Sequence, residues 1–355
     1  GDHPFYTSSQ IIKKYTDTPF YNGQSLVFGT GGSASVHITP NYFSASNDCY
    51  VAKVTHQNVF ARYVYYYLLS NIHIIEAGFM GAGLKHVSKQ YLSEIKVPLP
   101  SLEEQKRIAL ILDKANALRR KREEAIKLSD ELKRASFLNM FADPDDGWKQ
   151  MTVANVAKNT KGSIRTGPFG SQLLHSEFTD EGIAVLGIDN AVKNRFFWAK
   201  PRFISKEKYE QLKRFTVKPN DLLITIMGTC GRSAIVPHNC PTAINTKHLC
   251  CITLDETICM PEFLHSYFLM HPASINYLSK MAKGAVMDGL NLGIIKELPI
   301  YLPPLKLQKK YVKIYKRIEL NREKLTVSSQ STNNLFASLA QQAFDGELTK
   351  QDKVA

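Results

Sequence analysis

The longest regular pattern of apolar and polar positions lies in two stretches, 102–141 and 305–345, neither of which contains proline or glycine. In each stretch apolar residues recur at steps of three and four, which is the period of one helix face. They are Ile108, Ile111, Ala115, Leu118, Ala125 and Leu132 in the first stretch and Tyr311, Ile314, Ile318, Leu325, Leu335 and Leu339 in the second. Because polar residues such as Arg122 and Thr332 interrupt each stripe, the pattern favours a paired coiled coil over two helices that each pack on their own domain.

The same short motif stands before both stretches. Residues 99–105 read "LPSLEEQ" and residues 302–308 read "LPPLKLQ". In the first motif Ser101 and Glu104 form a capping box, which predicts the start of a helix. The second motif has Pro304 and Leu307 at those positions, so the shared frame is Leu-Pro-x-Leu-x-x-Gln.

This motif ends a longer internal repeat. Residues 81–108 align without a gap to residues 284–311, and earlier blocks recur in the same order: "FGTGGSASV" at 28–36 with "MGTCGRSAI" at 227–235, and "YVYYYLLS" at 63–70 with "FLHSYFLM" at 263–270. Two collinear copies of one domain explain this order. The chain is therefore predicted to be an internal duplication with pseudo-twofold symmetry, in which the two long helices run antiparallel.

Within each copy, short β-rich runs bounded by turn residues precede an aromatic helix, which is typical of a mixed α/β (α+β) domain. We predict a first domain at 1–100, a helix at 101–142, a second domain at 147–303 and a second helix at 304–345. The segment "GIAVLGIDN" at 182–190 corresponds to "GDHPFYTSS" at 1–9. We therefore expect the first copy to lack the opening segment of the second, either naturally or because the chain is a fragment.

Charge points to an anionic partner. The net charge is +13 with a pI near 9.3, which favours nucleic acid, although a basic enzyme remains an alternative at this stage. No apolar run approaches the roughly 20 residues that cross a bilayer, so no membrane association is predicted. Cys49 is the only cysteine in the first half and the other five cluster in the second, and this uneven distribution favours reduced thiols in the cytoplasm over a disulfide framework. A zinc set of His238, Cys240, His248 and Cys250 matches no common spacing, and no metal is predicted.

Catalytic motifs are absent from the sequence. There is no G-x-x-x-x-G-K-[ST] loop, no G-x-S-x-G elbow, no H-E-x-x-H and no Asp/Asn-Pro-Pro-Phe/Tyr tetrapeptide of adenine methyltransferases. The glycines of "GTGG" and "GTCG" are predicted to form tight β-turns rather than phosphate cradles, because neither leads into a helix. We predict a non-catalytic protein that binds no cofactor.

The repeat favours recognition, because its framework matches while polar residues on its turns differ. Arg and Lys suit guanine edges and phosphates, and Asn and Gln suit adenine edges. The predicted DNA-binding residues are Thr30, Ser33, Ser35, Asn47, Lys85, His86 and Ser88 in the first copy and Lys161, Ser163, Arg165, Gln172, Thr229, Arg232, Asn245, Thr246, Lys247, His248 and Asn291 in the second. For each residue taken alone, a solvated loop position without a ligand is the alternative.

Together these features resemble the DNA-specificity subunit of type I restriction-modification systems. The resemblance rests on the two Leu-Pro-x-Leu-x-x-Gln motifs, the segments "GAGLKHVS" and "GAVMDGLN", the "GTGG" and "GTCG" turns and "QQAFDGEL" at 341–348. It implies two target-recognition domains separated by the helices, each reading one half of a bipartite, asymmetric site in double-stranded DNA.

The resemblance also implies partners. Two modification subunits would methylate adenine, and restriction subunits would cleave, while this chain stays non-catalytic. Each helix of about 60 Å is slightly shorter than two turns of B-DNA, so the pair is predicted to fix the spacer between half-sites. A protein of a different functional class is the alternative: a protein-interaction adaptor with two similar domains, whose positive charge is incidental.

Overall fold

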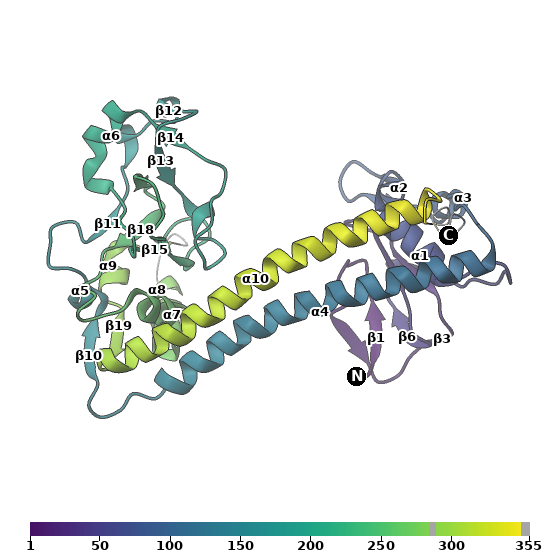
Figure 1. Cartoon of the computed structure of the whole chain (residues 1–355), viewed down its shortest axis with the longest axis horizontal. Coiled ribbons are helices and arrows are strands. Elements are labelled where there is room, and N and C mark those ends of the chain that lie inside the picture. Colours follow the sequence, from purple (N-terminus) through teal and green to yellow (C-terminus); the bar gives the residue numbers. More distant parts are fainter. Residues whose placement is uncertain (284–288, 349–355) are drawn as a thin grey trace, which may run out of the picture. The chain divides into compact units, whose positions relative to one another are not determined.

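The computed structural model describes residues 1–283 and 289–348 (Figure 1). The chain divides into two compact units. Unit 1 contains residues 1–126 and the chain from Lys324 onward, and unit 2 contains Lys127–Glu323. Each unit therefore consists of one domain copy and one part of each long helix. Part of the repeated segment "GAVMDGLN", residues 284–288, lies outside the described residues.

Unit 1 contains two main sheets. The first has the order β5 (Ser35–Ile38), β4 (Leu26–Gly29), β7 (Cys49–Ala52), and all its pairs are antiparallel. The second has the order β2 (Lys14–Thr16), β1 (His3–Tyr6), β6 (Tyr42–Ala45), β3 (Tyr21–Asn22), with β1 parallel to β6. Helices α1 (Ala61–Ser70), α2 (Ile72–Glu76) and α3 (Lys89–Glu94) follow, with the hairpin β8 (Phe79–Met80) and β9 (His86–Val87) between α2 and α3.

Unit 2 repeats this arrangement with additions. One sheet has the order β11 (Ile164–Thr166), β18 (Leu249–Ile252), β15 (Leu222–Thr225), β16 (Ser233–Ile235). The other has the order β12 (Phe178–Thr179), β14 (Phe203–Ile204), β13 (Ile183–Leu186), β17 (Ala243–Asn245), with β13 parallel to β17. Strands β10 (Lys149–Thr152) and β19 (Pro299–Leu302) pair beside α10. Because β13 pairs with β17 as β1 pairs with β6, β13 is the counterpart of β1. The predicted alignment of 182–190 with 1–9 is wrong by one residue, since Tyr6 and Leu186 accept equivalent hydrogen bonds, from the N–H groups of Ser46 and Thr246.

Among the described residues of unit 2, four helices pack on the sheet that contains β15: α5 (Val153–Val156), α7 (Pro261–Met270), α8 (Pro272–Lys283) and α9 (Leu292–Lys296). Helix α6 (Lys206–Leu212) packs on the sheet that contains β13. Residues of α5, α7, α9, β15 and β18 share one buried cluster with the start of the last helix. The sheet that contains β13 lies further from that helix than the sheet that contains β15 (Figure 1). The fold is thus mixed α/β, as predicted.

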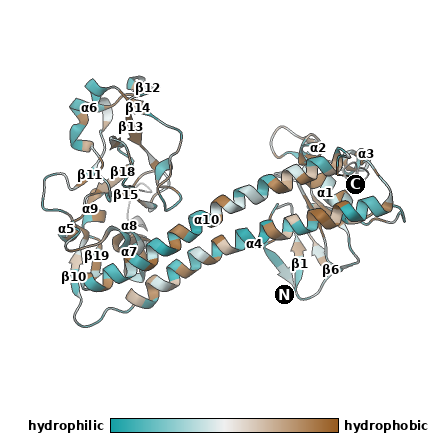
Figure 2. Cartoon of the chain, viewed as in Figure 1, coloured by the Kyte–Doolittle hydropathy of each residue, from teal (hydrophilic) through white to brown (hydrophobic). Residues whose placement is uncertain are grey.

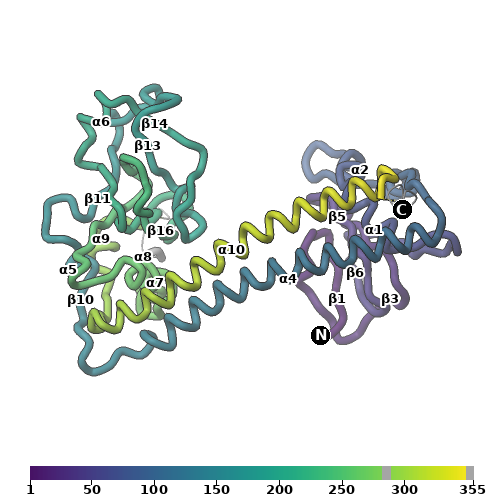
Figure 3. The backbone as a smooth tube through the Cα atoms, in the orientation of Figure 1, coloured from purple at the N-terminus to yellow at the C-terminus, as the bar shows by residue number. Residues whose placement is uncertain are grey.

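The two long helices are α4 (Leu102–Phe141) and α10 (Leu305–Phe344), and they lie side by side (Figure 3). In unit 1 the start of α4 packs against the end of α10, since Ile108 and Leu112 share a buried cluster with Phe336. In unit 2 the end of α4 packs against the start of α10, because the rings of Phe137 and Tyr311 lie 5.4 Å apart. The helices are therefore antiparallel and paired, as predicted.

The predicted apolar stripes are only partly correct. Ile108, Ala115, Tyr311 and Ile318 are buried, but Leu118, Leu132 and Leu335 are 41%, 56% and 49% exposed. Aromatic residues outside the predicted stripes take the interior positions instead, namely Phe137, Phe141 and Phe336. Figure 2 shows the consequence, because hydrophilic and hydrophobic positions interleave along both helices instead of forming two continuous bands.

The glutamine of each repeated motif has the same function in both copies. Gln105 accepts a hydrogen bond from the Phe60 backbone N–H and donates to the carbonyls of Asn58 and Pro100. Gln308 accepts from the Met260 N–H and donates to the carbonyls of Ile258 and Pro303. Both side chains are fully buried. Each glutamine thus ties the start of a long helix to the segment that enters α1 or α7, which explains why the frame is kept while the capping residues differ.

Candidate nucleic-acid interface

The "GTGG" and "GTCG" segments form tight turns between antiparallel strands, as predicted. "GTGG" connects β4 to β5, and "GTCG" connects β15 to β16. Gly32, Gly228 and Gly231 have φ of 78°, 70° and 76°, a left-handed conformation that glycine adopts without a steric cost. In the second turn the buried Thr225 hydroxyl donates to the Thr229 carbonyl and accepts from the Arg232 N–H at 2.9 Å. The turn is therefore rigid, and the side chains of Thr229 and Arg232 point away from the core and are exposed.

In the first domain, three predicted segments meet at this turn. The Thr30 N–H and hydroxyl both donate to the Asp48 carbonyl, and the Thr30 carbonyl accepts from the Val87 N–H. Gly31 and His86 form an isolated β-bridge. The residues of these segments form what we call the first turn cluster: Thr30, Ser33, Asn47, Lys85 and His86. All of them except the half-buried Thr30 are exposed.

In the second domain, the equivalent segments also converge. The Ile226 N–H donates to the His248 carbonyl, the Gly167 N–H donates to the Thr246 carbonyl, and the Leu290 N–H donates to the Ile226 carbonyl. We call the predicted residues on these segments the second turn cluster: Thr229, Arg232, Thr246, Lys247 and His248. Gln172 and Asn291 follow Gly167 and Leu290 closely in the chain.

The second turn cluster is electropositive. The pKa of His248 is lowered, first by burial and then by the positive charges of Lys247 and Arg202. Arg202 in turn pairs with Asp189. Because Asp189 offsets the charge of Arg202, Lys247 and the exposed Arg232 are the cations of this cluster that suit an anionic ligand such as a phosphate.

Several predicted residues have structural functions. Ser88 and Asn291, which are equivalent in the repeat, cap α3 and α9 by accepting from the N–H groups of Tyr91 and Ile294. The Asn245 amide is buried and donates to the Leu249 carbonyl, and the Ser35 hydroxyl is also buried. Gln172 accepts from the Phe169 N–H. Ser and Asn are both good helix caps, so the difference between the two domains at this position does not indicate that they bind different DNA sequences.

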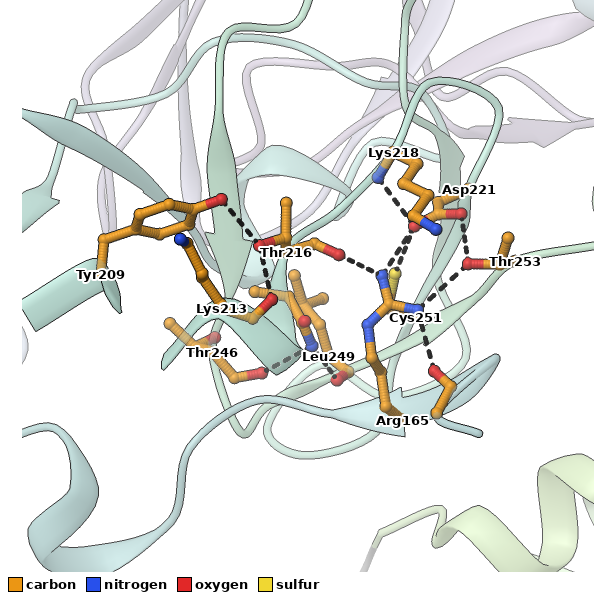
Figure 4. A network of polar contacts seen from close by, with 12 residues as sticks. Arg165, Tyr209, Lys213, Thr216, Lys218, Asp221, Thr246, Leu249, Cys251 and Thr253 are labelled. Atoms are coloured by element: carbon orange, nitrogen blue, oxygen red, sulfur yellow. Dashed lines mark hydrogen bonds and ion pairs between the residues drawn. The ribbon is translucent and has the colours of Figure 1, made fainter. Parts of the chain in front are cut away.

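Arg165 is directed into the protein (Figure 4). Its guanidinium pairs with Asp221 at 2.8 Å and donates to the Thr216 carbonyl and the Thr253 hydroxyl. The pKa of Arg165 is raised: burial lowers it, but the negative charge of Asp221 and the hydrogen bond to it outweigh burial. The pair is nearly inaccessible, with the Asp221 side chain 1% exposed. The Arg165 donors are therefore used to hold β11 against the neighbouring strands.

Lys161 and Ser163 lie apart from the second turn cluster. Strand β11 pairs with β18 so that Thr166 faces Cys250 and Ile164 faces Ile252. The Ser163 carbonyl accepts from the Thr253 N–H, at the end of β18 opposite to His248. The structure thus does not bring these two residues together with the turn residues.

Sequence reasoning missed one segment beside the second turn cluster, the loop Gly187–Arg202 between β13 and β14. Its residues 193–202 read "KNRFFWAKPR", in which basic and aromatic residues alternate closely. Trp198 is 49% exposed and lines, with Lys200 and Arg202, an otherwise largely apolar pocket of about 310 Å³. Exposed aromatic residues among cations are typical of nucleic-acid surfaces, and this composition was the available signal.

The structure shows no metal-binding group of three or more His, Cys, Asp or Glu side chains within residues 1–283 and 289–348. The same ranges contain no helix that is long and apolar enough to span a membrane.

Comparisons with known proteins agree with this arrangement. The family model "Type I restriction modification DNA specificity domain" matches residues 1–128 and 147–327. The "Type I restriction enzyme EcoBI specificity subunit" of Escherichia coli is 26% identical over 385 aligned residues, which cover 99% of this chain and 78% of that protein. The MjaVIII specificity subunit of Methanocaldococcus jannaschii is 24% identical over 277 residues, which cover 72% of this chain and 63% of that protein.

Solved structures show the same fold. The type I restriction-modification S subunit from M. genitalium superposes with a TM-score of 0.63 at 16% identity, covering 97% of this chain and 89% of that one. A chain from a study of complex assembly in the type I R-M system gives a TM-score of 0.53 at 14% identity, covering 97% of this chain and 92% of that one.

Proposed function

Because the chain belongs to the type I restriction-modification DNA-specificity family, we propose that each of its two domains reads one half of a bipartite, asymmetric DNA site. The chain is the DNA-specificity subunit of a type I system and is itself non-catalytic. Family membership also favours DNA recognition over the alternative of a protein-interaction adaptor.

The convergence of equivalent segments on one turn in each domain is the observation that carries the proposal. The first turn cluster presents Thr30, Asn47 and His86, whereas the second presents Thr229, Arg232 and Lys247. A shared framework with different donors and acceptors suits two surfaces that read different base sequences. We assign the exposed and half-buried members of both clusters, with Lys161, Ser163 and Gln172, as candidates for base or phosphate contacts, and Ser35, Ser88, Arg165, Asn245 and Asn291 as residues that support the loops.

The helix pair is proposed to set the spacer and to dock two modification subunits. Each helix is about 60 Å long, which is slightly less than two turns of B-DNA. The chain is part of a type I complex that includes modification subunits and DNA. We propose that restriction subunits join the same complex and that it acts in the cytoplasm, where the DNA substrate is found.

Methylation-site mapping with the complete system tests the proposal. The chain is co-expressed with its modification subunits, and methylated adenines are located by sequencing. We expect one bipartite motif with two defined half-sites and a fixed unread spacer. A single continuous motif, or methylation without sequence preference, would refute the two-domain assignment.

A further inference from the structure

One arginine connects the second domain to both long helices. Arg195, in the loop Gly187–Arg202, donates from Nη2 to Asp130 of α4 at 2.7 Å and from Nε to Glu319 of α10 at 3.0 Å. All three residues belong to unit 2. The loop comes from the sheet that contains β13, the one further from α10, so this contact joins the outer part of the domain directly to the helix pair.

The two carboxylates are held in place by cations of the helices themselves. Lys133 of α4 donates to Glu319 at 2.7 Å, and Arg322 of α10 donates to Asp130 at 2.9 Å. The Lys133 side chain is 7% exposed, and those of Arg195 and Glu319 are each 24% exposed. We call Arg195, Asp130 and Glu319, with Lys133 and Arg322, the ionic latch. Since its charges are partly buried, salt screens them less than it screens surface pairs.

The loop presents Arg195 in a fixed conformation. The Asn190 side chain accepts from the Gly187 N–H and donates to the Phe197 carbonyl, which closes the loop from both sides. Asn194, next to Arg195, has φ of 56° and accepts from the Ser233 N–H at 3.2 Å. Ser233 is the second residue after the "GTCG" turn and begins β16. The latch is therefore one residue away from a hydrogen bond to the hairpin that bears Thr229 and Arg232.

Among the residues that the structure describes, the first domain has no counterpart of this latch. Its corresponding loop between β1 and β2 is the short segment 7–13, compared with residues 187–202 in the second domain. The repeat register that relates Gln105 to Gln308 relates Asn116 to Glu319 and Asn333 to Asp130, so both carboxylates are replaced by amides. The same register places Phe336 where Lys133 stands, and the Arg119 guanidinium lies 4.7 Å from the centre of its ring.

We propose that Arg195 is a positioning residue, which through the ionic latch fixes the second turn cluster relative to the helices and so restricts the spacer at which the second half-site is read. This inference rests on the proposed function of the two domains. It assigns a different mechanical constraint to each half-site, because the first domain pairs with the helices through Arg62 of α1 and Asp113 of α4, at 44% and 31% exposure, and not through a loop of its outer sheet.

The test uses the complete complex with Arg195→Met and maps both the rate and the positions of adenine methylation. We expect both half-sites to remain unchanged in sequence. We expect the rate at cognate sites to fall about tenfold, which corresponds to about 1.4 kcal/mol of lost coupling. Sites whose spacer is one base pair longer or shorter are expected to gain methylation relative to cognate sites.

Two further variants separate positioning from general stability. Arg214→Met removes an exposed arginine of the same domain and is expected to leave the spacer preference unchanged. The double variant Arg195→Met/Glu319→Gln is expected to relax the spacer no further than Arg195→Met alone, because both changes break the same latch.

An unchanged spacer preference in folded Arg195→Met, or an equal effect of Arg214→Met, would overturn the inference. If the proposed function itself is wrong, the wild-type complex will lack a bipartite methylation motif, and this result distinguishes the two cases.

Discussion

Replacing Glu319 with glutamine is expected to destabilise unit 2 by about 3 kcal/mol at neutral pH. Burial raises the pKa of Glu319, but the hydrogen bonds and charges of Arg195 and Lys133 outweigh burial and lower it from 4.5 to about 2. At 1.36 kcal/mol per pKa unit, that depression is worth about 3 kcal/mol of folding free energy. The substitution also leaves Lys133 buried beside a neutral amide, which acts in the same direction.

The effect has a defined pH window. A carboxylate whose pKa is lowered by folding contributes its full stabilisation above its unfolded pKa and loses it as the pH falls towards the folded pKa. The difference between wild type and Glu319→Gln is therefore expected to be constant above pH 4.5 and to shrink towards pH 2. His265, which faces the latch from α7, has a pKa lowered to about 3 by burial and by Lys133, so it is neutral at pH 4.5 and becomes protonated only as the pH approaches 3.

Urea unfolding followed by tryptophan fluorescence measures this difference. Both tryptophans of the chain, Trp148 and Trp198, lie in unit 2, so the signal reports on the unit that contains the latch. Glu323→Gln serves as the matched control, because Glu323 is an exposed carboxylate on the same helix. The reasoning is wrong if Glu319→Gln changes the free energy of unfolding no more than Glu323→Gln does, or if the difference from wild type is the same at pH 7 and pH 3.

Three other outcomes are expected. Inserting one heptad within residues 110–135 of α4, with a matching insertion in α10, should change the length of the spacer but the sequence of neither half-site. If methylation mapping shows an unchanged spacer, the helix pair does not set its length. Gln308→Met should cost about 3 kcal/mol in urea unfolding, because three buried backbone groups lose their partner, whereas exposed Gln341→Met should cost almost nothing. Lys247→Met should weaken DNA binding and reduce the slope of log K against log salt concentration by about 1. An unaltered slope in a salt titration would show that Lys247 does not contact a phosphate.

The sequence was sufficient for the features that depend on local signals or on the repeat. Helix starts at the Leu-Pro motifs, the β-turns at the glycine pairs and the duplication itself all follow from short-range patterns. The pairing of α4 with α10 also follows, because two narrow stripes in one chain can bury each other.

Features that depend on distant partners could not be predicted in the same way. The helical period alone did not show that Leu118, Leu132 and Leu335 would be exposed, because the buried face is chosen by where the domain helices pack. Arg165 was assigned to DNA because nothing near it in sequence indicates Asp221, which lies 56 residues away. Arg195 was overlooked for the same reason, since its carboxylate partners lie 65 and 124 residues away in opposite directions.

The division of each long helix between two units bears on how such a chain could arise. The first half of α4 completes unit 1, and its second half completes unit 2 together with the start of α10. A polypeptide with only one domain and its helix would leave half of that helix without a partner, and a second identical copy, running antiparallel, would supply the missing half. Fusing two such genes would then free each copy to change independently, and the latch in one domain with amides in the other is the kind of divergence that fusion permits.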